Sequence, residues 1–112
     1  MDVAKIESAV QNLLSNAFKY TSQNGRIELA VSEAEIDGRP YCLVTVSDNG
    51  VGIPDDLQQH VFDSFVTGKR IPQYSTSIGL GLHIVKHTMG LHHGFVTLTS
   101  RVGEGSRFVL HI

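Results

Sequence analysis

The strongest constraint on the fold is a pair of strand-like segments joined by a tight turn. The segment "RIELAVSEAEI" (26–36) alternates apolar and polar residues, which is typical of a strand with one buried face. "DGRP" (37–40) then leads directly into "YCLVTVSD" (41–48), a second strand-like run. Because so few residues separate the two runs, they are predicted to form a hairpin.

Segments with helical spacing lie before and after this hairpin. In residues 6–20 apolar residues recur at i, i+3, i+4 and i+7, which predicts an amphipathic helix ending near Tyr20. A short amphipathic helix is predicted for "DDLQQHVFDSF" (55–65), after the glycine loop "NGVGIP" (49–54). In "IGLGLHIVKHTMGLHHG" (78–94) a glycine turn is predicted to open a further helix.

The chain closes with a second hairpin. "FVTLTSRV" (95–102) and "SRFVLHI" (106–112) are strand-like, and the turn "GEG" joins them. The order is therefore helix, two strands, helices and two strands. This order predicts an α/β (α+β) two-layer sandwich with the helices on one face of a sheet.

Composition and length are those of one small globular domain. The chain has 112 residues, of which 41% are apolar and 18% charged, enough for a single core. The formal net charge of -2 gives no basic footprint, so no nucleic acid partner is expected. No apolar run approaches the ~18 residues that a membrane span needs, and the first residues lack the apolar region of a secretory signal. We expect a cytoplasmic domain without direct membrane insertion, whose parent protein is either soluble or membrane-anchored.

A single cysteine, Cys42, lies in the second strand-like run. One cysteine excludes a disulfide framework within the chain. Its neighbours Tyr41 and Leu43 predict that the Cys42 thiol is buried, in a protein of a reducing compartment.

Two asparagines stand beside the apolar stripe of the first helical segment. Asn is a poor residue inside a helix because its amide competes with the backbone, yet Asn12 and Asn16 share one flank. An amide oxygen suits Mg²⁺ as a ligand, and Lys19 on the same flank can meet a phosphate as a point charge. The alternative is that both asparagines simply lie at the solvent edge of the helix.

A second polar feature follows the predicted hairpin, in "SDNGVGIP" (47–54). Asp48 ends an apolar strand and can accept a hydrogen bond from an exocyclic amine such as that of adenine. Gly50 and Gly52 let the backbone approach a ligand closely or adopt a positive φ. The alternative is an ordinary turn stabilised by the Asp side chain.

Two glycines and a basic pair suggest a region that binds phosphate. Gly79 and Gly81 precede a predicted helix, whose free amide groups and dipole favour an anion at its N-terminus. Lys69 and Arg70 lie between the two glycine segments, where they either reach phosphate when a lid closes or remain solvated. The spacing matches neither a P-loop nor the dinucleotide-binding fingerprint.

Taken together, these segments resemble the N, G1, F and G2 boxes of the GHKL ATPase/kinase superfamily. The four segments are "NLLSNAFKYT" (12–21), "SDNGVGIP" (47–54), "VFDSF" (61–65) and "SIGLGLHIVKHTMGLHHG" (77–94), and "GEGSRFVLHI" (103–112) resembles the family's closing strand. The chain is most similar to the ATP-binding catalytic domain of two-component sensor histidine kinases, over nearly its whole length. The resemblance implies a Bergerat-type fold with a mixed, mostly antiparallel sheet, and it makes residues 1–112 a single domain.

The resemblance also implies a role for each motif residue. Asn16 corresponds to the asparagine that ligates Mg²⁺, Asn12 would support the metal or a phosphate, and Lys19 would contact phosphate. Asn16 and Lys19 are thus the expected catalytic residues. Asp48 would bind the adenine amino group directly, and Tyr20 would pack on the adenine. The other residues expected to bind ATP are Gly50, Gly52, Ile53, Lys69, Arg70, Gly79, Leu80, Gly81, Leu82, His83 and Ser106, the last through a water.

Three positions depart from the family's pattern. Asn12 stands where the gyrase-like and Hsp90-like members that hydrolyse ATP carry a catalytic glutamate, so self-contained hydrolysis is not expected. Ile78 stands where family kinases often have a hydroxyl residue, which removes one contact to phosphate. His93 occupies a position where glycine is common.

The function that the resemblance implies is that of a protein histidine kinase catalytic domain. It would bind Mg·ATP and donate the γ-phosphate to a histidine on a separate phosphoacceptor and dimerisation domain of the same parent chain. A response regulator would be an indirect partner. None of the six histidines stands in a phosphoacceptor-like context, so this chain alone should transfer no phosphate.

Two alternatives to this function stay open. One is a catalytically degenerate module that senses nucleotide or binds protein, which Ile78 suggests. The other is a serine kinase of the anti-sigma type. That class would need a carboxylate one turn before Asn16, where this sequence has Asn12.

Overall fold

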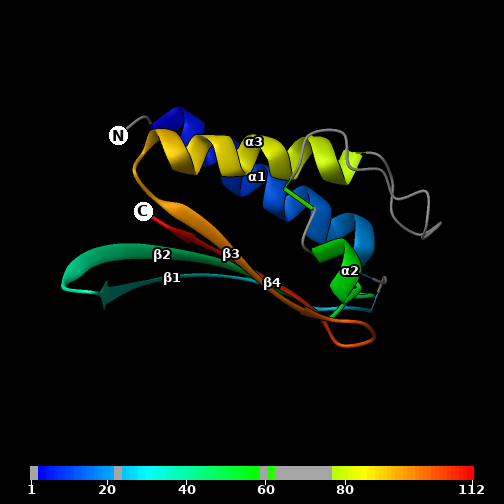
Figure 1. The fold of residues 1–112 in the computed structure, drawn as a ribbon. Helices are drawn as coiled ribbons and strands as arrows, with labels where there is room; N and C mark the ends of the chain where they lie inside the picture. The colour runs from blue at the N-terminus through cyan, green and yellow to red at the C-terminus, as the bar shows by residue number, and fades with distance from the viewer. Residues whose placement is uncertain (1–2, 22–23, 59–60, 63–76) are drawn as a thin grey trace.

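The chain folds into a four-stranded antiparallel sheet with helices on one face (Figure 1). The computed structural model describes residues 3–21, 24–58, 61–62 and 77–112, and it leaves out the side chains of 77–81. The strands are β1 (Ile27–Ile36), β2 (Arg39–Asp48), β3 (Phe95–Arg101) and β4 (Gly105–His111), in the sheet order β1–β2–β4–β3. The fold class predicted from the sequence is confirmed.

Two hairpins make up the sheet, as the alternation and turn signals predicted. In the first, Asp37 and Gly38 form the turn with positive φ angles of 53° and 78°, the backbone that a tight two-residue hairpin connection requires. The central pairing of β2 with β4 joins the hairpins. It sets Asp48, the last residue of β2, opposite Ser106 near the start of β4.

Helices α1 (Val3–Tyr20) and α3 (Ser77–Leu91) lie side by side over one face of the sheet (Figure 1). The short α2 (Asp55–Gln58) lies near the turn between β3 and β4. The apolar stripe of α1 and the inward residues of β2 and β4 meet between the layers. The buried core consists of Ala9, Leu13, Ala17, Val44, Val46, Ile53, Leu57, Val61, Leu82, Val85, Met89, Phe108 and Leu110.

The structure corrects the predicted start of one helix and describes another predicted helix only in part. Helix α3 begins at Ser77, so Gly79 and Gly81 lie within the helix and not in a turn before it. The helix predicted for 55–65 is described only as α2, followed by a turn at Val61 and Phe62. The other residues of that prediction lie outside the described part of the chain.

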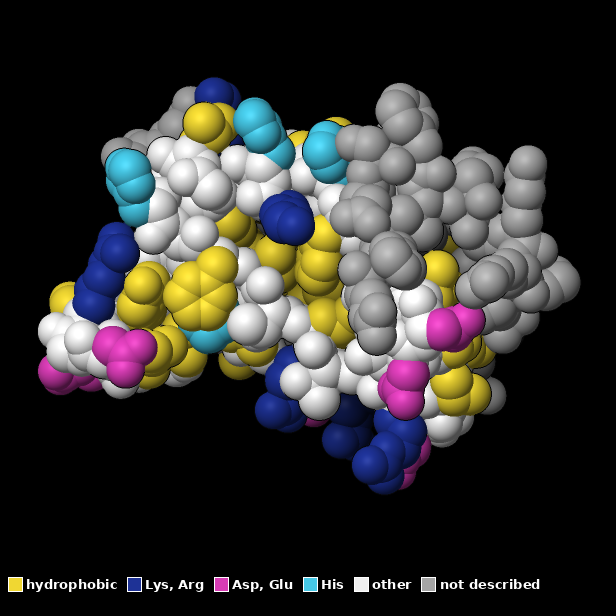
Figure 2. Space-filling model, viewed as in Figure 1, with side chains coloured by type: hydrophobic (Ala, Val, Ile, Leu, Met, Phe, Trp, Pro, Cys, Tyr) yellow, Lys and Arg dark blue, Asp and Glu magenta, His cyan; other side chains and the backbone are white. Residues whose placement is uncertain are grey.

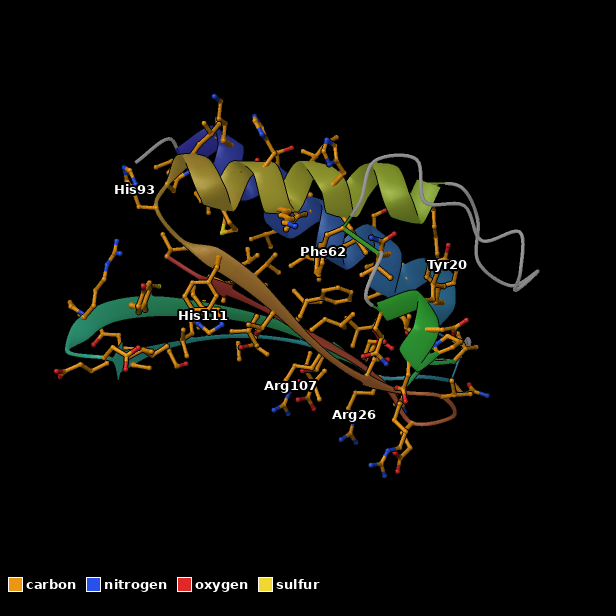
Figure 3. The ribbon with its side chains drawn as sticks, in the orientation of Figure 1. Tyr20, Arg26, Phe62, His93, Arg107 and His111 are labelled. Atoms are coloured by element: carbon orange, nitrogen blue, oxygen red, sulfur yellow. The ribbon has the colours of Figure 1, made fainter. Side chains whose placement is uncertain are left out.

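A left-handed residue ends helix α3. The amide of Gly94 donates to the carbonyl of Met89 at 2.9 Å, and the amide of His93 donates to Gly90 at 3.2 Å. This pair of bonds is the Schellman pattern, which places one residue at positive φ. That residue is His93, with φ of 58°, at the end of α3 far from Tyr20 (Figure 3).

The face of the sheet away from the helices carries an aromatic cluster. The rings of Phe95 and His111 stack with centroids 4.0 Å apart, and Tyr41 meets Phe95 edge-on at 5.5 Å. His111 is 9% exposed; its Nε2 lies 3.2 Å from the Thr97 hydroxyl, and its Nδ1 has no hydrogen-bond partner among the described residues. Burial lowers the pKa of His111, because desolvation disfavours the charged imidazolium.

Cys42 is exposed, so the prediction of a buried thiol is wrong. The residue lies in the part of β2 nearer the hairpin turn, where neighbouring apolar residues are also uncovered. On β1, Leu29 and Val31 remain 51% and 68% exposed, although they are opposite the buried Val46 and Val44. The helices pack against β2 and β3, so this edge of the sheet receives little cover.

Charged side chains gather below the sheet, where basic and acidic groups lie close together (Figure 2). Arg101 and Glu104 approach to 3.2 Å, and Arg26 and Glu28 to 3.7 Å. Both pairs are exposed, so each contributes little to stability. Within the described part of the chain, no helix is both long and apolar enough to cross a membrane.

Candidate functional site

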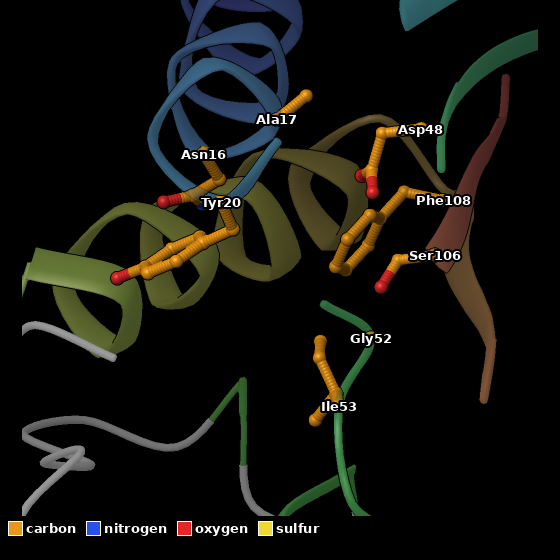
Figure 4. Close-up of a pocket in the computed structure, with 8 residues that line it drawn as sticks. All are labelled: Asn16, Ala17, Tyr20, Asp48, Gly52, Ile53, Ser106 and Phe108. Atoms are coloured by element: carbon orange, nitrogen blue, oxygen red, sulfur yellow. The ribbon is translucent and has the colours of Figure 1, made fainter. Parts of the chain in front are cut away.

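A pocket opens between the end of α1, the loop after β2 and the start of β4 (Figure 4). Its empty space, including the open mouth, is about 310 Å³. It is lined by Asn16, Ala17, Tyr20, Asp48, Gly52, Ile53, Ser106 and Phe108. All but Ala17 and Phe108 were predicted site residues, so the fold gathers into one pocket residues that are far apart in the sequence.

Asp48 is the charged group of this pocket. Its Oδ1 accepts a hydrogen bond from the Gly50 amide at 2.8 Å, and the carboxylate also accepts from the Ser106 amide. Burial raises the pKa of Asp48 above its ordinary value, and these two backbone hydrogen bonds offset only part of that effect. Asp48 therefore does stabilise the turn that was predicted as its alternative role. Its carboxylate still has lone pairs left for a donor in the pocket.

The glycines of the loop after β2 allow backbone segments to touch. A Cβ on Gly50 would lie 2.2 Å from the Tyr20 carbonyl oxygen. Gly52 has φ of +75°, and a Cβ there would lie 2.1 Å from the Arg101 carbonyl oxygen. The glycines thus bind the loop tightly to the ends of α1 and β3. At Gly50 the space that a side chain would need is filled by the C-terminal backbone of α1, so this glycine serves the packing of the loop against the helix.

Asn16 lies on the helix wall of the pocket, across from Asp48 (Figure 4). The side chain is 7% exposed, and its amide nitrogen has no hydrogen-bond partner among the described residues. Such an unsatisfied buried group is costly and calls for a physical reason. The unpaired nitrogen can donate to an acceptor of a ligand bound in the pocket, whereas the atom that Mg²⁺ would accept is the oxygen of the same amide. No cluster of three or more His, Cys, Asp or Glu side chains suited to a metal occurs among the described residues.

Two residues outside the motifs hold the pocket's floor. The Ile53 amide donates to Ser100 Oγ at 2.8 Å, and Gln58 Nε2 donates to the Ile53 carbonyl at 2.6 Å. Ser100 Oγ also lies 2.8 Å from the Oγ of Ser106, which lines the pocket. Neither residue was predicted from the sequence as part of the site. Alternation with Val96 and Leu98 could have placed Ser100 on the inward face of β3, where a polar residue is unusual.

The other predicted residues lie outside this pocket or outside the described part of the chain. Lys19 is exposed on the last turn of α1, and Asn12 is half-buried one turn before Asn16. Leu82 is fully buried in the core, and His83 is exposed on α3. The backbone of Gly79, Leu80 and Gly81 belongs to α3, and Lys69 and Arg70 are not among the described residues.

Comparison with known proteins gives consistent matches. Residues 1–112 match the model of the family described as histidine kinase-, DNA gyrase B-, and HSP90-like ATPase. The sensor histidine kinase TmoS of Ectopseudomonas mendocina is 38% identical over 109 residues, which are 96% of this chain and 11% of that protein. The alginate biosynthesis sensor protein KinB of Pseudomonas aeruginosa is 36% identical over 110 residues, 98% of this chain and 17% of that protein.

Solved structures agree with these relatives. The catalytic domain of histidine kinase ThkA matches with a TM-score of 0.80 and 27% identity, over 100% of this chain and 69% of that one. Full-length ShkA in complex with AMPPNP matches with a TM-score of 0.76 and 25% identity, over 99% of this chain and 22% of that one. The chain thus spans only a small part of the curated relatives. Because the family model matches its whole length, the chain belongs to the histidine kinase-, DNA gyrase B- and HSP90-like ATPase family.

Proposed function

We propose that this domain binds Mg·ATP in the pocket and donates the γ-phosphate to a histidine on a phosphoacceptor domain of its parent protein. The observation that carries the proposal is the convergence of two polar groups with unused hydrogen-bonding capacity. The Asp48 carboxylate and the Asn16 amide face one pocket from opposite walls. Among the pocket-lining residues, the rest of the surface is largely apolar, which suits the faces of a purine.

Asp48 would select the base. When ionised, its carboxylate can accept hydrogen bonds but cannot donate them. It therefore pairs with the exocyclic amine of adenine and repels a carbonyl oxygen at the same place. Apolar side chains of Ile53 and Phe108 line the pocket, as does the ring of Tyr20. These surfaces would hold the purine while Asp48 fixes its orientation.

Asn16 and Lys19 would serve the phosphates. The Asn16 amide oxygen would ligate Mg²⁺, which when bound neutralises phosphate charge, and the ammonium of Lys19 would meet a phosphate. Phosphoryl transfer depends mostly on positioning and on charge stabilisation, so no general base is required of this chain. The acceptor histidine would come from a separate domain, and a response regulator would receive the phosphoryl group later.

Calorimetric titration of ATP and ADP, with and without Mg²⁺, tests the proposal. We expect wild type to bind ATP, and Asn16→Ala to weaken binding at least tenfold with Mg²⁺ and much less without it. Ser15→Ala, at an exposed neighbour on α1, is the matched control and should bind as wild type does. Failure of wild type to bind ATP, or a loss in Asn16→Ala that is independent of Mg²⁺, would contradict the proposal.

A further inference from the structure

Ser100 lies directly behind the pocket residue Ser106. The two are opposite each other in the pairing of β3 with β4, so their side chains share the inward face of the sheet. Their Oγ atoms are 2.8 Å apart. Ser106 lines the pocket and Ser100 does not.

The hydrogen bonds around Ser100 indicate which serine donates to the other. Ser100 Oγ accepts from the Ile53 amide at 2.8 Å and donates to the Gly105 carbonyl at 2.9 Å. A hydroxyl has one proton, and a carbonyl oxygen can only accept. Either serine could donate in the bond between them. We take Ser106 as the donor, because Ser100 then donates to the Gly105 carbonyl and both hydroxyl protons are used.

We propose that Ser100 is a positioning residue that sets the base specificity of the pocket by taking the proton of Ser106. This inference rests on the proposed function. With its proton engaged, Ser106 Oγ offers only lone pairs to a base that contacts it directly. Asp48, opposite Ser106 in the sheet, is an acceptor as well. The strand wall therefore presents two acceptors.

Two acceptors discriminate between purines by the group at position 6. Adenine carries an amine there, which donates hydrogen bonds, whereas hypoxanthine and guanine carry a carbonyl oxygen, which accepts them. A free serine hydroxyl can rotate to donate or to accept, so it cannot discriminate between the two. Fixing the direction of the Ser106 hydroxyl removes that tolerance.

Gln58 belongs to the same hydrogen-bond network as Ser100 and serves as a control position. Its Nε2 donates to the backbone carbonyls of Ile53 at 2.6 Å and Ser100 at 3.0 Å. It therefore holds the same segments together as Ser100 does, but it bonds to carbonyls and not to the serine hydroxyls. A variant of Gln58 should loosen the pocket without changing the direction of the Ser106 hydroxyl.

Affinities for ATP and for inosine triphosphate, measured calorimetrically with Mg²⁺, test the inference. The two nucleotides differ at position 6 and in the protonation of the adjacent nitrogen. We expect the ATP preference of wild type to fall about tenfold in Ser100→Ala, the effect of about one hydrogen bond, because Ser106 can then donate to the carbonyl. Ser100→Thr keeps the hydroxyl and should keep the preference. Gln58→Leu should lower the affinities for both nucleotides by the same factor.

A double variant tests the route through Ser106. Ser106→Ala should itself lower the preference for ATP, and adding Ser100→Ala should change it no further. If circular dichroism shows Ser100→Ala to be unfolded, Ser106→Ala alone decides, and an unchanged preference there overturns the inference. A preference that survives Ser100→Ala, or that falls equally in Gln58→Leu, also overturns it. Lack of ATP binding by wild type refutes the proposed function itself, and the inference with it.

Discussion

Replacing Asn16 by leucine should stabilise the nucleotide-free domain while abolishing Mg²⁺-dependent nucleotide binding. Asn16 is 7% exposed and its amide nitrogen is buried without a partner among the described residues. An unsatisfied buried polar group costs about 1–3 kcal/mol. Leucine removes that cost and adds apolar contact with the neighbouring core, in which Leu13 and Ala17 are buried.

The expected gain is about 1–2 kcal/mol, because the longer leucine side chain must also fit against its neighbours. The pocket beside Asn16 provides space for that adjustment. In a domain of this size, such a gain raises the melting temperature by roughly 5–10 °C. Urea denaturation followed by circular dichroism measures the free energy of unfolding, and calorimetry measures nucleotide binding on the same samples.

Asn12→Leu is the matched control, since Asn12 lies on the same helix one turn earlier but does not line the pocket. It should change stability by less than about 0.5 kcal/mol. An Asn16→Leu variant no more stable than wild type would contradict the cost assigned to the buried amide. A variant that still binds ATP more tightly with Mg²⁺ than without it would contradict the role of Asn16 toward the metal.

Three further predictions follow from single side chains. His93→Gly should stabilise the domain by about 0.5–1 kcal/mol in urea denaturation, because glycine adopts the φ of 58° without strain. The control His92→Gly should destabilise the domain, because it removes the 2.8 Å hydrogen bond from the imidazole ring to the Thr88 carbonyl. As the pH is lowered, ATP affinity should begin to fall at a higher pH than for an ordinary carboxyl, because burial raises the pKa of Asp48 and the protonated carboxyl, which is uncharged and carries an O–H donor, is a weaker acceptor for an amine. Titration calorimetry across pH, with Asp48→Asn as control, measures this. The free energy of unfolding should be constant above about pH 6.5 and should decrease below it. Burial lowers the pKa of His111, so below that pH the unfolded chain binds more protons than the folded one. His111→Phe should remove this dependence.

The hairpin, helix α1 and the main polar residues of the site could be predicted because their signals are local. The turn at Asp37 and Gly38 and the alternation on both sides fix the pairing of β1 with β2. Helical spacing alone orients the flank of α1 that carries Asn16. Glycines next to a strand end likewise mark Asp48 as a special position.

Other features depend on which distant segments become neighbours, and no local pattern contains that information. Ser100 acts on the pocket only because β3 pairs with β4. Alternation predicts one buried face for the strand at 26–36, but it does not reveal how far the helices extend over that face, and Leu29 and Val31 are left exposed. For the same reason the exposure of Cys42 was missed. The start of α3 was misplaced because glycines weaken a helix but do not prevent one when tertiary packing supports it.

The two walls of the pocket differ in how firmly they are held, and this difference divides the work of recognition. On the strand wall, Asp48 and Ser106 are paired in the sheet, and Gly52 packs directly against the backbone of β3. These groups cannot shift independently, so they suit recognition of a rigid purine. On the helix wall, the amide nitrogen of Asn16 has an unused donor, which suits an acceptor of the ligand such as a phosphate oxygen, and the oxygen of the same amide is the atom that a metal would take. Base selectivity should therefore respond to changes in the sheet network, and metal dependence to changes on α1.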